Sequence, residues 1–311
     1  MSGDLRALVE AELGATAPAH AVAMAADLAR RFEGPLAVLF YGSVLRTGDL
    51  DGVMDFYVLT AAPRRGLRGM AGRVLWPDVS YHEFEAGGRT HRAKVAAMTL
   101  EQFQGAVGGE GIDTTIWTRF VQPCALVWTA QPDVAGQVAS AIARAARTAA
   151  RFAAVVGPAE GRPNDYWTAL FRETYAAEFR VEAGGREAQI IGVNPGRYET
   201  MLLAAWRADG LAFDTRADGE VSPRPADRAR VLSAWRLRRN LGKPLNLARL
   251  VKAAFTFEGA ARYAAWKIER HTGLKVPLTP WRERHVILAS PGVFWRLWKA
   301  RRSALRPPPQ A

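Results

Sequence analysis

A Gly-Ser pair followed by one acidic residue is the first chemically suggestive feature of the chain, in the stretch FYGSVLRTGDLDGVMDFYVLT at 40–60. Glycine lets the backbone turn tightly against a phosphate, and the Ser43 hydroxyl with nearby amide groups can bind phosphate oxygens. Asp55 follows Gly42 by thirteen residues and offers a hard oxygen ligand for Mg²⁺, an ion that bridges a triphosphate and an attacking oxygen. This spacing predicts a Mg²⁺-dependent site for a nucleoside triphosphate.

The same stretch lacks a neighbouring second carboxylate. Val53 stands two residues before Asp55, where nucleotidyl-transferring sites usually have another acid. Asp49 and Asp51 lie in the preceding Gly-rich loop, where a carboxylate is more often solvated than bound to metal. The pattern also fits a simple β-turn followed by a strand with a structural aspartate, and residues 40–60 alone leave both interpretations open.

Two strands must position the turn and the acid. The run LAVLFYG at 36–42 is too short and too aromatic for a helix and predicts a buried strand. A second strand is predicted over VMDFYVLT at 53–60, where alternation places Asp55, Tyr57 and Leu59 on one face. The Gly-Ser turn thus ends one strand, and the acid lies within the next.

After these two strands, the sequence first predicts both strands and helices and then mainly helices. Two strands are expected within 80–100, joined at Ala86-Gly87-Gly88, and a helix and a strand are expected on either side of Pro123. Polar residues and two prolines at 214–227 predict a surface loop or linker. The expected helices cover 20–32, 133–155 with Asp133 as the cap, 166–182, 228–240, 246–271 and 291–306.

Composition and charge narrow the class of protein. Hydrophobic content of 49% and ten Trp predict a folded chain, and a single cysteine, Cys124, excludes an internal disulfide and a thiolate zinc cluster. Neither a secretory signal nor a membrane-spanning run is recognisable, so the expected location is cytoplasmic. From Arg228 onward, 19 Lys and Arg face three acids, a net charge of +16, whereas the preceding residues sum to −4. This asymmetry predicts a polyanionic surface as partner, either nucleic acid or anionic lipid.

Short motifs in a fixed order resemble one particular family. They are Tyr41-Gly42-Ser43, Val53-Met54-Asp55-Phe56, Lys94 after a Gly-Arg turn, Gln122-Pro123, RETYAAEFR with Tyr175, Glu178, Phe179 and Arg180, and LARLVKAAFTFEG with Arg249 and Lys252. This order is similar to the mitochondrial-type CTP:phosphatidate cytidylyltransferases (CDP-diacylglycerol synthases) of the mitochondrial translocator-maintenance family, within the polymerase-β-like nucleotidyltransferases. The resemblance covers most of 36–270. Three departures are Glu178 in place of Asp, Val44 in place of Gly, and a shorter tract between Leu59 and Val79.

The resemblance implies a fold and a set of roles. The expected fold is α/β (α+β): a polymerase-β-like nucleotidyltransferase domain with a mixed sheet over 1–160, a mostly helical basic domain over 161–290, and a basic amphipathic helix and tail over 291–311. The implied site residues fall into three groups. Asp55, Glu178 and Lys94 are catalytic, the two carboxylates holding Mg²⁺; Tyr41, Gly42, Ser43 and Lys94 bind the nucleotide; and Arg180, Arg249 and Lys252 bind the acceptor. Two alternatives stay open, a solvated helix face for Glu178 and a solvent-facing strand lysine for Lys94.

The implied function is Mg²⁺-dependent transfer of a cytidylyl group from CTP to phosphatidic acid, giving CDP-diacylglycerol and pyrophosphate for phospholipid synthesis. The alternatives are an RNA-directed or other-substrate nucleotidyltransferase of the same fold and a non-catalytic lipid-surface binding protein. No RNA-binding module is recognisable, so nucleic acid is not the expected partner. The cytidine preference and the lipid acceptor come from the resemblance alone.

The final basic segment predicts a membrane contact. SPGVFWRLWKARRSALR reads as a helix with Ser290 as cap, and it combines apolar and cationic faces that suit an anionic lipid surface. The expected membrane-binding residues are Phe294, Trp295, Trp298, Arg301 and Arg302. A helix that packs its apolar side on the protein core is the alternative. A peripheral position on the inner membrane face is therefore expected.

Overall fold

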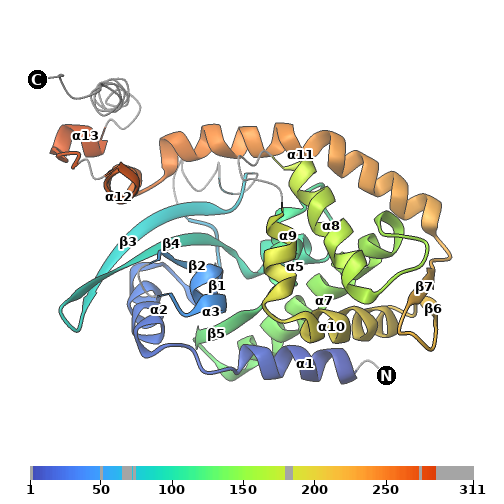
Figure 1. The fold of residues 1–311 in the computed structure, drawn as a ribbon. Helices are drawn as coiled ribbons and strands as arrows, with labels where there is room; N and C mark the ends of the chain where they lie inside the picture. The colour runs from blue at the N-terminus through green and yellow to red at the C-terminus, as the bar shows by residue number, and fades with distance from the viewer. Residues whose placement is uncertain are drawn as a thin grey trace, which may run out of the picture.

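A mixed five-stranded sheet forms one side of the molecule (Figure 1). The computed structural model describes residues 3–49, 52–64, 72, 75–178, 185–272 and 275–284. The strands are β1 (Pro35–Tyr41), β2 (Met54–Thr60), β3 (Asp78–Ala86), β4 (Arg89–Thr99) and β5 (Cys124–Thr129). Their order is β3-β4-β2-β1-β5, in which only β2 and β4 pair in parallel. An α+β chain with a mixed sheet is confirmed.

The strand register brings the predicted site residues to one end of the sheet. Tyr41 at the end of β1 pairs with Asp55 on β2, and Asp55 pairs with Lys94 on β4. Paired residues on neighbouring strands project to the same face. The Gly-Ser turn directly follows Tyr41 and therefore lies at this end.

Each face of the sheet has its own apolar core, as the predicted alternation of β2 requires. Tyr57 and Leu59 belong to the core shared with the large helical part of the chain. Met54, Phe56 and Val58 pack on the opposite face, against helix α2 (Ala19–Arg31). Asp55, two residues before Tyr57, therefore projects toward the helical part.

Besides α2, the described chain before α11 forms a group of helices that includes the long, Ala-rich α7. They are α1 (Gly3–Leu13), α3 (Ser43–Thr47), α5 (Leu100–Val107), α6 (Thr115–Phe120), α7 (Pro132–Val156), α8 (Pro163–Ala177), α9 (Arg186–Gly192) and α10 (Pro195–Ala208). The small buried side chains of α7 allow α1, α5, α6, α8 and α10 all to pack against it. Its cap is Gln131 rather than the predicted Asp133, which lies in the first turn after Pro132.

Local sequence signals explain where several helices begin and end. Thr99 and Gln102 form a reciprocal capping box at the start of α5. Asn194 accepts a hydrogen bond from the Arg197 amide at the start of α10. Helix α8 ends at Ala177, earlier than the predicted 166–182, since the next residue adopts an extended conformation.

The basic C-terminal part differs from the prediction in two places. Polar residues 214–227 do not form a loop throughout, since β6 (Ala212–Thr215) and β7 (Val221–Arg224) pair as a small antiparallel sheet. Helix α11 (Arg228–Thr256) is continuous through Pro244, so the predicted break between 240 and 246 is wrong. The break falls instead before α12 (Ala260–Thr272), which is followed by α13 (Pro280–Arg284).

Helix α11 spans the molecule and contacts α7, α8 and β3 (Figure 1, top). It is the element that joins the helical part to the sheet edge. The predicted helix over 291–306 lies outside the described residues. Within the described part of the chain, no helix combines the length and the hydropathy needed to cross a bilayer.

Candidate functional site

Asp55 lies against the Gly-Ser turn. Gly42 has φ 93°, and a Cβ built there would lie 2.5 Å from Oδ2 of Asp55. Only glycine permits both this backbone conformation and this approach. The local sequence thus fixes a carboxylate directly beside the turn. Ser43 begins α3 with an exposed side chain.

Burial and four cations have opposite effects on the pKa of the Asp55 carboxyl group. Burial raises its pKa, whereas Lys94, Arg119, Arg46 and Arg186, in decreasing order of influence, oppose that rise. These cations come from four different elements, namely β4, α6, α3 and α9. Cations from four separate segments of the chain thus act on one buried carboxyl group.

Arg119 is the central side chain of this cluster. Its Nη1 donates to the Tyr57 hydroxyl at 2.9 Å, and its guanidinium lies 5.3 Å from the ring centroid of Tyr41. Burial disfavours its charge, but Tyr41, Tyr57, Asp55 and Glu178 outweigh burial and raise its pKa. Arg119 therefore stays charged and lies within the electrostatic reach of both predicted catalytic carboxylates.

Glu178 is positioned by the end of α8. It is the C-terminal cap, is only 5% exposed, and accepts a hydrogen bond from Thr114 Oγ1 at 3.2 Å. The alternative of a solvated helix face is therefore wrong, because the residue is buried beyond the helix. A Cβ at Gly242 of α11 would lie 2.6 Å from the Ala177 carbonyl oxygen, so α11 packs tightly against the residue before Glu178.

Further polar side chains line the approach to Asp55. Arg46 Nη1 donates to Gln122 Oε1 at 3.3 Å. The charges of Tyr175 and Arg186 act on Arg46, which places these residues near it as well. The motifs containing Gln122 and Tyr175, which the resemblance singled out, thus meet around Arg46.

Lys94 and Tyr41 flank the carboxylate on the neighbouring strands. Lys94 has an exposed side chain at the rung beside Asp55 and acts on its pKa. Burial raises the pKa of the Tyr41 hydroxyl, and Arg119 opposes that shift. Both residues lie on strands that pair directly with β2.

Arg249 and Lys252 are engaged in contacts within the protein. Arg249 pairs with Asp113, and its guanidinium lies 4.8 Å from the Trp76 ring centroid. The Lys252 ammonium pairs with Asp78 and donates to the Leu75 carbonyl at 2.7 Å. Arg249 thus ties α11 to the segment before α6, and Lys252 ties it to the start of β3. Their predicted contact with an acceptor remains a prediction.

The other predicted substrate and membrane residues lie outside the described part of the chain. They are Arg180, Phe294, Trp295, Trp298, Arg301 and Arg302.

Sequence reasoning missed Arg119, Arg46 and Arg186. For Arg119 a signal existed, because a lone arginine within the apolar run IWTRF must find partners when its helix is buried. Arg46 and Arg186 carried no such signal. Their contribution depends on two distant segments that converge on Asp55.

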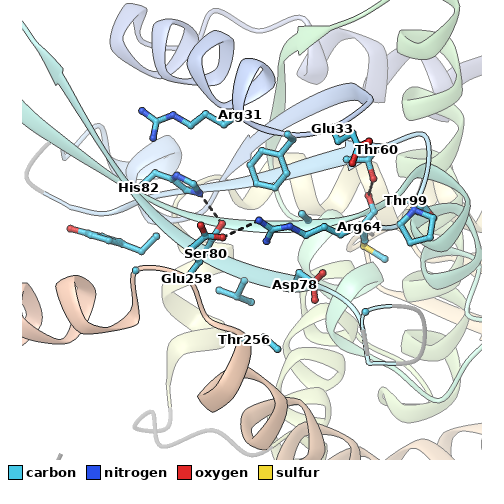
Figure 2. Close-up of a pocket in the computed structure, with 18 of the residues that line it drawn as sticks. Arg31, Glu33, Thr60, Arg64, Asp78, Ser80, His82, Thr99, Thr256 and Glu258 are labelled. Atoms are coloured by element: carbon cyan, nitrogen blue, oxygen red, sulfur yellow. Dashed lines mark hydrogen bonds and ion pairs between the residues drawn. The ribbon is translucent and has the colours of Figure 1, made fainter. Parts of the chain in front are cut away.

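A separate pocket of about 940 Å³ lies along β3 and beyond the ends of β2 and β4 (Figure 2). Ser80 Oγ and His82 Nε2 are 2.8 Å apart there, and Arg64 pairs with Glu258 at 3.1 Å across it. Asp55 is not among its lining residues. This pocket is therefore distinct from the carboxylate and cation cluster.

The residues around Asp55 fit a magnesium ion that is shared with a substrate. Among the described residues, no group of three or more His, Cys, Asp and Glu side chains could hold a metal ion by itself. Mg²⁺ is usually bound through one or two carboxylates, with substrate phosphates and water as its other ligands. Asp55 and Glu178 both act on the charge of Arg119, and their sharing of one metal ion remains a prediction.

Comparison with known proteins adds no relative, as neither a protein-family model nor a curated protein matches the chain.

Proposed function

We propose that the chain transfers a cytidylyl group from CTP to phosphatidic acid, with Mg²⁺, giving CDP-diacylglycerol and pyrophosphate. The observation that carries the proposal is the Asp55 carboxylate, which lies against a glycine turn and is surrounded by four cations. A nucleoside triphosphate and a metal ion together match this arrangement in charge. The motif resemblance supports cytidine as the base and phosphatidic acid as the acceptor.

Charge neutralisation and positioning are the main tasks of the site. A phosphate oxygen of phosphatidic acid attacks the α-phosphorus of CTP, and the bond from that phosphorus to the bridging oxygen breaks. The electron pair leaves with pyrophosphate. Lys94, Arg46 and Arg186 are arranged to stabilise this departing charge.

The carboxylates have a different task. Asp55 and Glu178 would hold the Mg²⁺, which supplies Lewis-acid stabilisation of the phosphoryl oxygens. Arg119 opposes the rise that burial causes in the pKa of Asp55, and it donates to Tyr57. A general base is unnecessary, because the attacking phosphate is already an anion.

The decisive experiment measures product with purified full-length protein, CTP, Mg²⁺ and phosphatidic acid in mixed micelles. We expect CDP-diacylglycerol and pyrophosphate in equal amounts. Other nucleotides, other lipids and an RNA acceptor are tested in parallel. Activity with RNA alone would replace the lipid acceptor, and no product in any arm would reject catalysis.

Two isosteric variants and one control locate the chemistry. Asp55→Asn and Glu178→Gln each remove one charge without changing shape, and we expect each to lower kcat/KM by about 100-fold or more. Asp49→Asn, in the exposed loop before β2, should retain activity. Loss of activity in Asp49→Asn together with a fully active Glu178→Gln would assign the second carboxylate to the loop.

A further inference from the structure

Helix α11 buries cations and leaves large apolar residues exposed. Val231 and Trp235 pack its first turns into the core, and beyond them its buried residues are Arg238, Gly242 and Lys252. Arg238 Nη2 donates to the Gly111 carbonyl at 2.8 Å. Beyond Trp235 this is the reverse of an ordinary surface helix, whose apolar stripe faces the core.

The outward side of α11 carries most of the exposed large apolar residues in the described chain. Six of the ten belong to it, and Phe255 is the most exposed at 71%. They recur at helical spacing from the third turn of the helix to its end: Leu237, Leu241, Leu247, Leu250, Val251 and Phe255. We call this set the outer stripe. Scattered exposed apolar residues need no explanation, but a contiguous stripe indicates an interaction surface.

Positive charge accompanies the outer stripe. Helix α11 contains eight Lys and Arg and no acidic residue. Arg236, Arg239 and Lys243 among them are exposed. An apolar stripe flanked by cations is complementary to the interface of an anionic bilayer, where apolar side chains enter the acyl boundary and cations meet headgroups.

We propose that the outer stripe of α11 docks the protein on an anionic lipid surface. A second copy of the chain is a poorer occupant, because two such stripes would bring like charges together. Nucleic acid is a poorer occupant as well, because it offers phosphates but nothing to cover leucine and phenylalanine. The bilayer matches both properties of the helix.

The docking surface is connected to the catalytic cluster through the same helix. Gly242 packs on the carbonyl of Ala177, the residue before Glu178, and Arg249 pairs with Asp113 beside Thr114. The proposal thereby deepens the proposed function, on which it rests for its lipid substrate. A lipid phosphate at the bilayer would approach the protein on the side where α11 contacts both the sheet and α8.

Flotation of the full-length protein with vesicles tests the proposal without CTP, so that binding is measured apart from catalysis. Vesicles of phosphatidylcholine alone are compared with vesicles that contain phosphatidylserine or phosphatidic acid. We expect binding to both anionic mixtures, little binding to the neutral one, and weakening by salt. Absence of binding to anionic vesicles would overturn the proposal, and so would equal binding to neutral ones.

Matched variants assign the binding to α11. Val251→Asp and Phe255→Asp together should lower the vesicle-bound fraction at least tenfold, whereas Val193→Asp should leave it unchanged. Val193 and Val251 are equally exposed, at 54% each, so the control matches both residue type and exposure. Circular dichroism verifies that the variants fold. If the double variant does not fold, the single variant Leu247→Asp is used in its place.

Three further outcomes distinguish the possible partners of the outer stripe and separate lipid docking from the proposed function. Unchanged binding in the α11 variants would overturn the proposal and leave the predicted terminal helix as the anchor. A dimer in sedimentation that the same variants dissociate would make the stripe a contact between copies. Activity on short-chain phosphatidic acid below its micelle concentration, without vesicle binding, would reject docking and keep the proposed function.

Discussion

Replacing Gly42 by alanine tests whether the turn is built around Asp55. Gly42 has φ 93° and ψ −163°, a region that is essentially restricted to glycine. Occupying it with another residue costs about 1–3 kcal/mol of folding free energy. The new Cβ would also lie 2.5 Å from Oδ2 and 3.2 Å from Cγ of Asp55, so the carboxylate must move.

The expected effect is large on activity and moderate on stability. In a chain of this size each kcal/mol changes Tm by about 2 °C, so Gly42→Ala should lower Tm by about 2–6 °C. Displacement of Asp55 by about 1 Å should lower kcat/KM about 100-fold. Calorimetry and initial rates of CDP-diacylglycerol formation measure the two effects. If no product is found under any condition, the Tm comparison still stands.

Gly48 provides the matched control. It also has a positive φ, 71°, but nothing lies within 4 Å of a Cβ built there. Gly48→Ala should therefore lose about 1–2 kcal/mol in stability and keep its activity. In an Asp55→Ala background, Gly42→Ala should cost about 1 kcal/mol less than in the wild type. Equal costs in both backgrounds, or wild-type activity of Gly42→Ala, would refute the close contact.

Two further predictions concern Arg119 and Cys124. Arg119→Met should lower kcat/KM about 100-fold and reduce the free energy of unfolding by about 1–3 kcal/mol, because it leaves Asp55 without a buried cation. Urea unfolding measures the loss, with exposed Arg144→Met as the control. Equal losses in the two variants would contradict this prediction. Burial raises the pKa of the Cys124 thiol to about 12, so the unfolded chain loses this proton first as pH rises above about 8.5. The wild type should therefore lose more stability than Cys124→Ala between pH 8.5 and 12, and folded protein should resist thiol labelling at pH 8. Rapid labelling of the folded protein would disprove burial of the thiol.

The strands around the site could be predicted because their signals are local. The apolar runs that form β1 and β2 and the glycine turn between β3 and β4 depend only on neighbouring residues. The face of β2 that carries Asp55 followed from alternation and agrees with the two cores. Cys124 is buried and forms no disulfide, as a chain with a single cysteine requires.

Helix α11 and the β6–β7 hairpin could not be predicted in the same way. Pro244 suggested a break, but it lies on the exposed side of α11, where the missing hydrogen bond leaves a carbonyl to water. Contacts of the inward side with α7, α8 and β3 stabilise the continuous helix. In the hairpin, Val221 alone is buried, so the sequence shows little alternation.

The role of Glu178 as the second carboxylate comes from motif order and not from physical reasoning, and it remains a prediction. More than a hundred residues separate Glu178 from Asp55, and both act on the charge of Arg119, which belongs to a third segment. No local pattern reports such an arrangement. The predicted helix through 182 also left a solvated Glu178 open, because the sequence does not show that α8 ends one residue earlier.

The surplus of positive charge around Asp55 has a consequence for turnover. Four cations against two carboxylates attract any polyphosphate, whether it is arriving or leaving. Under the proposed reaction, pyrophosphate retains most of the charge that held CTP. Release of pyrophosphate, rather than bond breaking, would then limit the turnover rate. That rate would depend on how quickly a cell removes pyrophosphate.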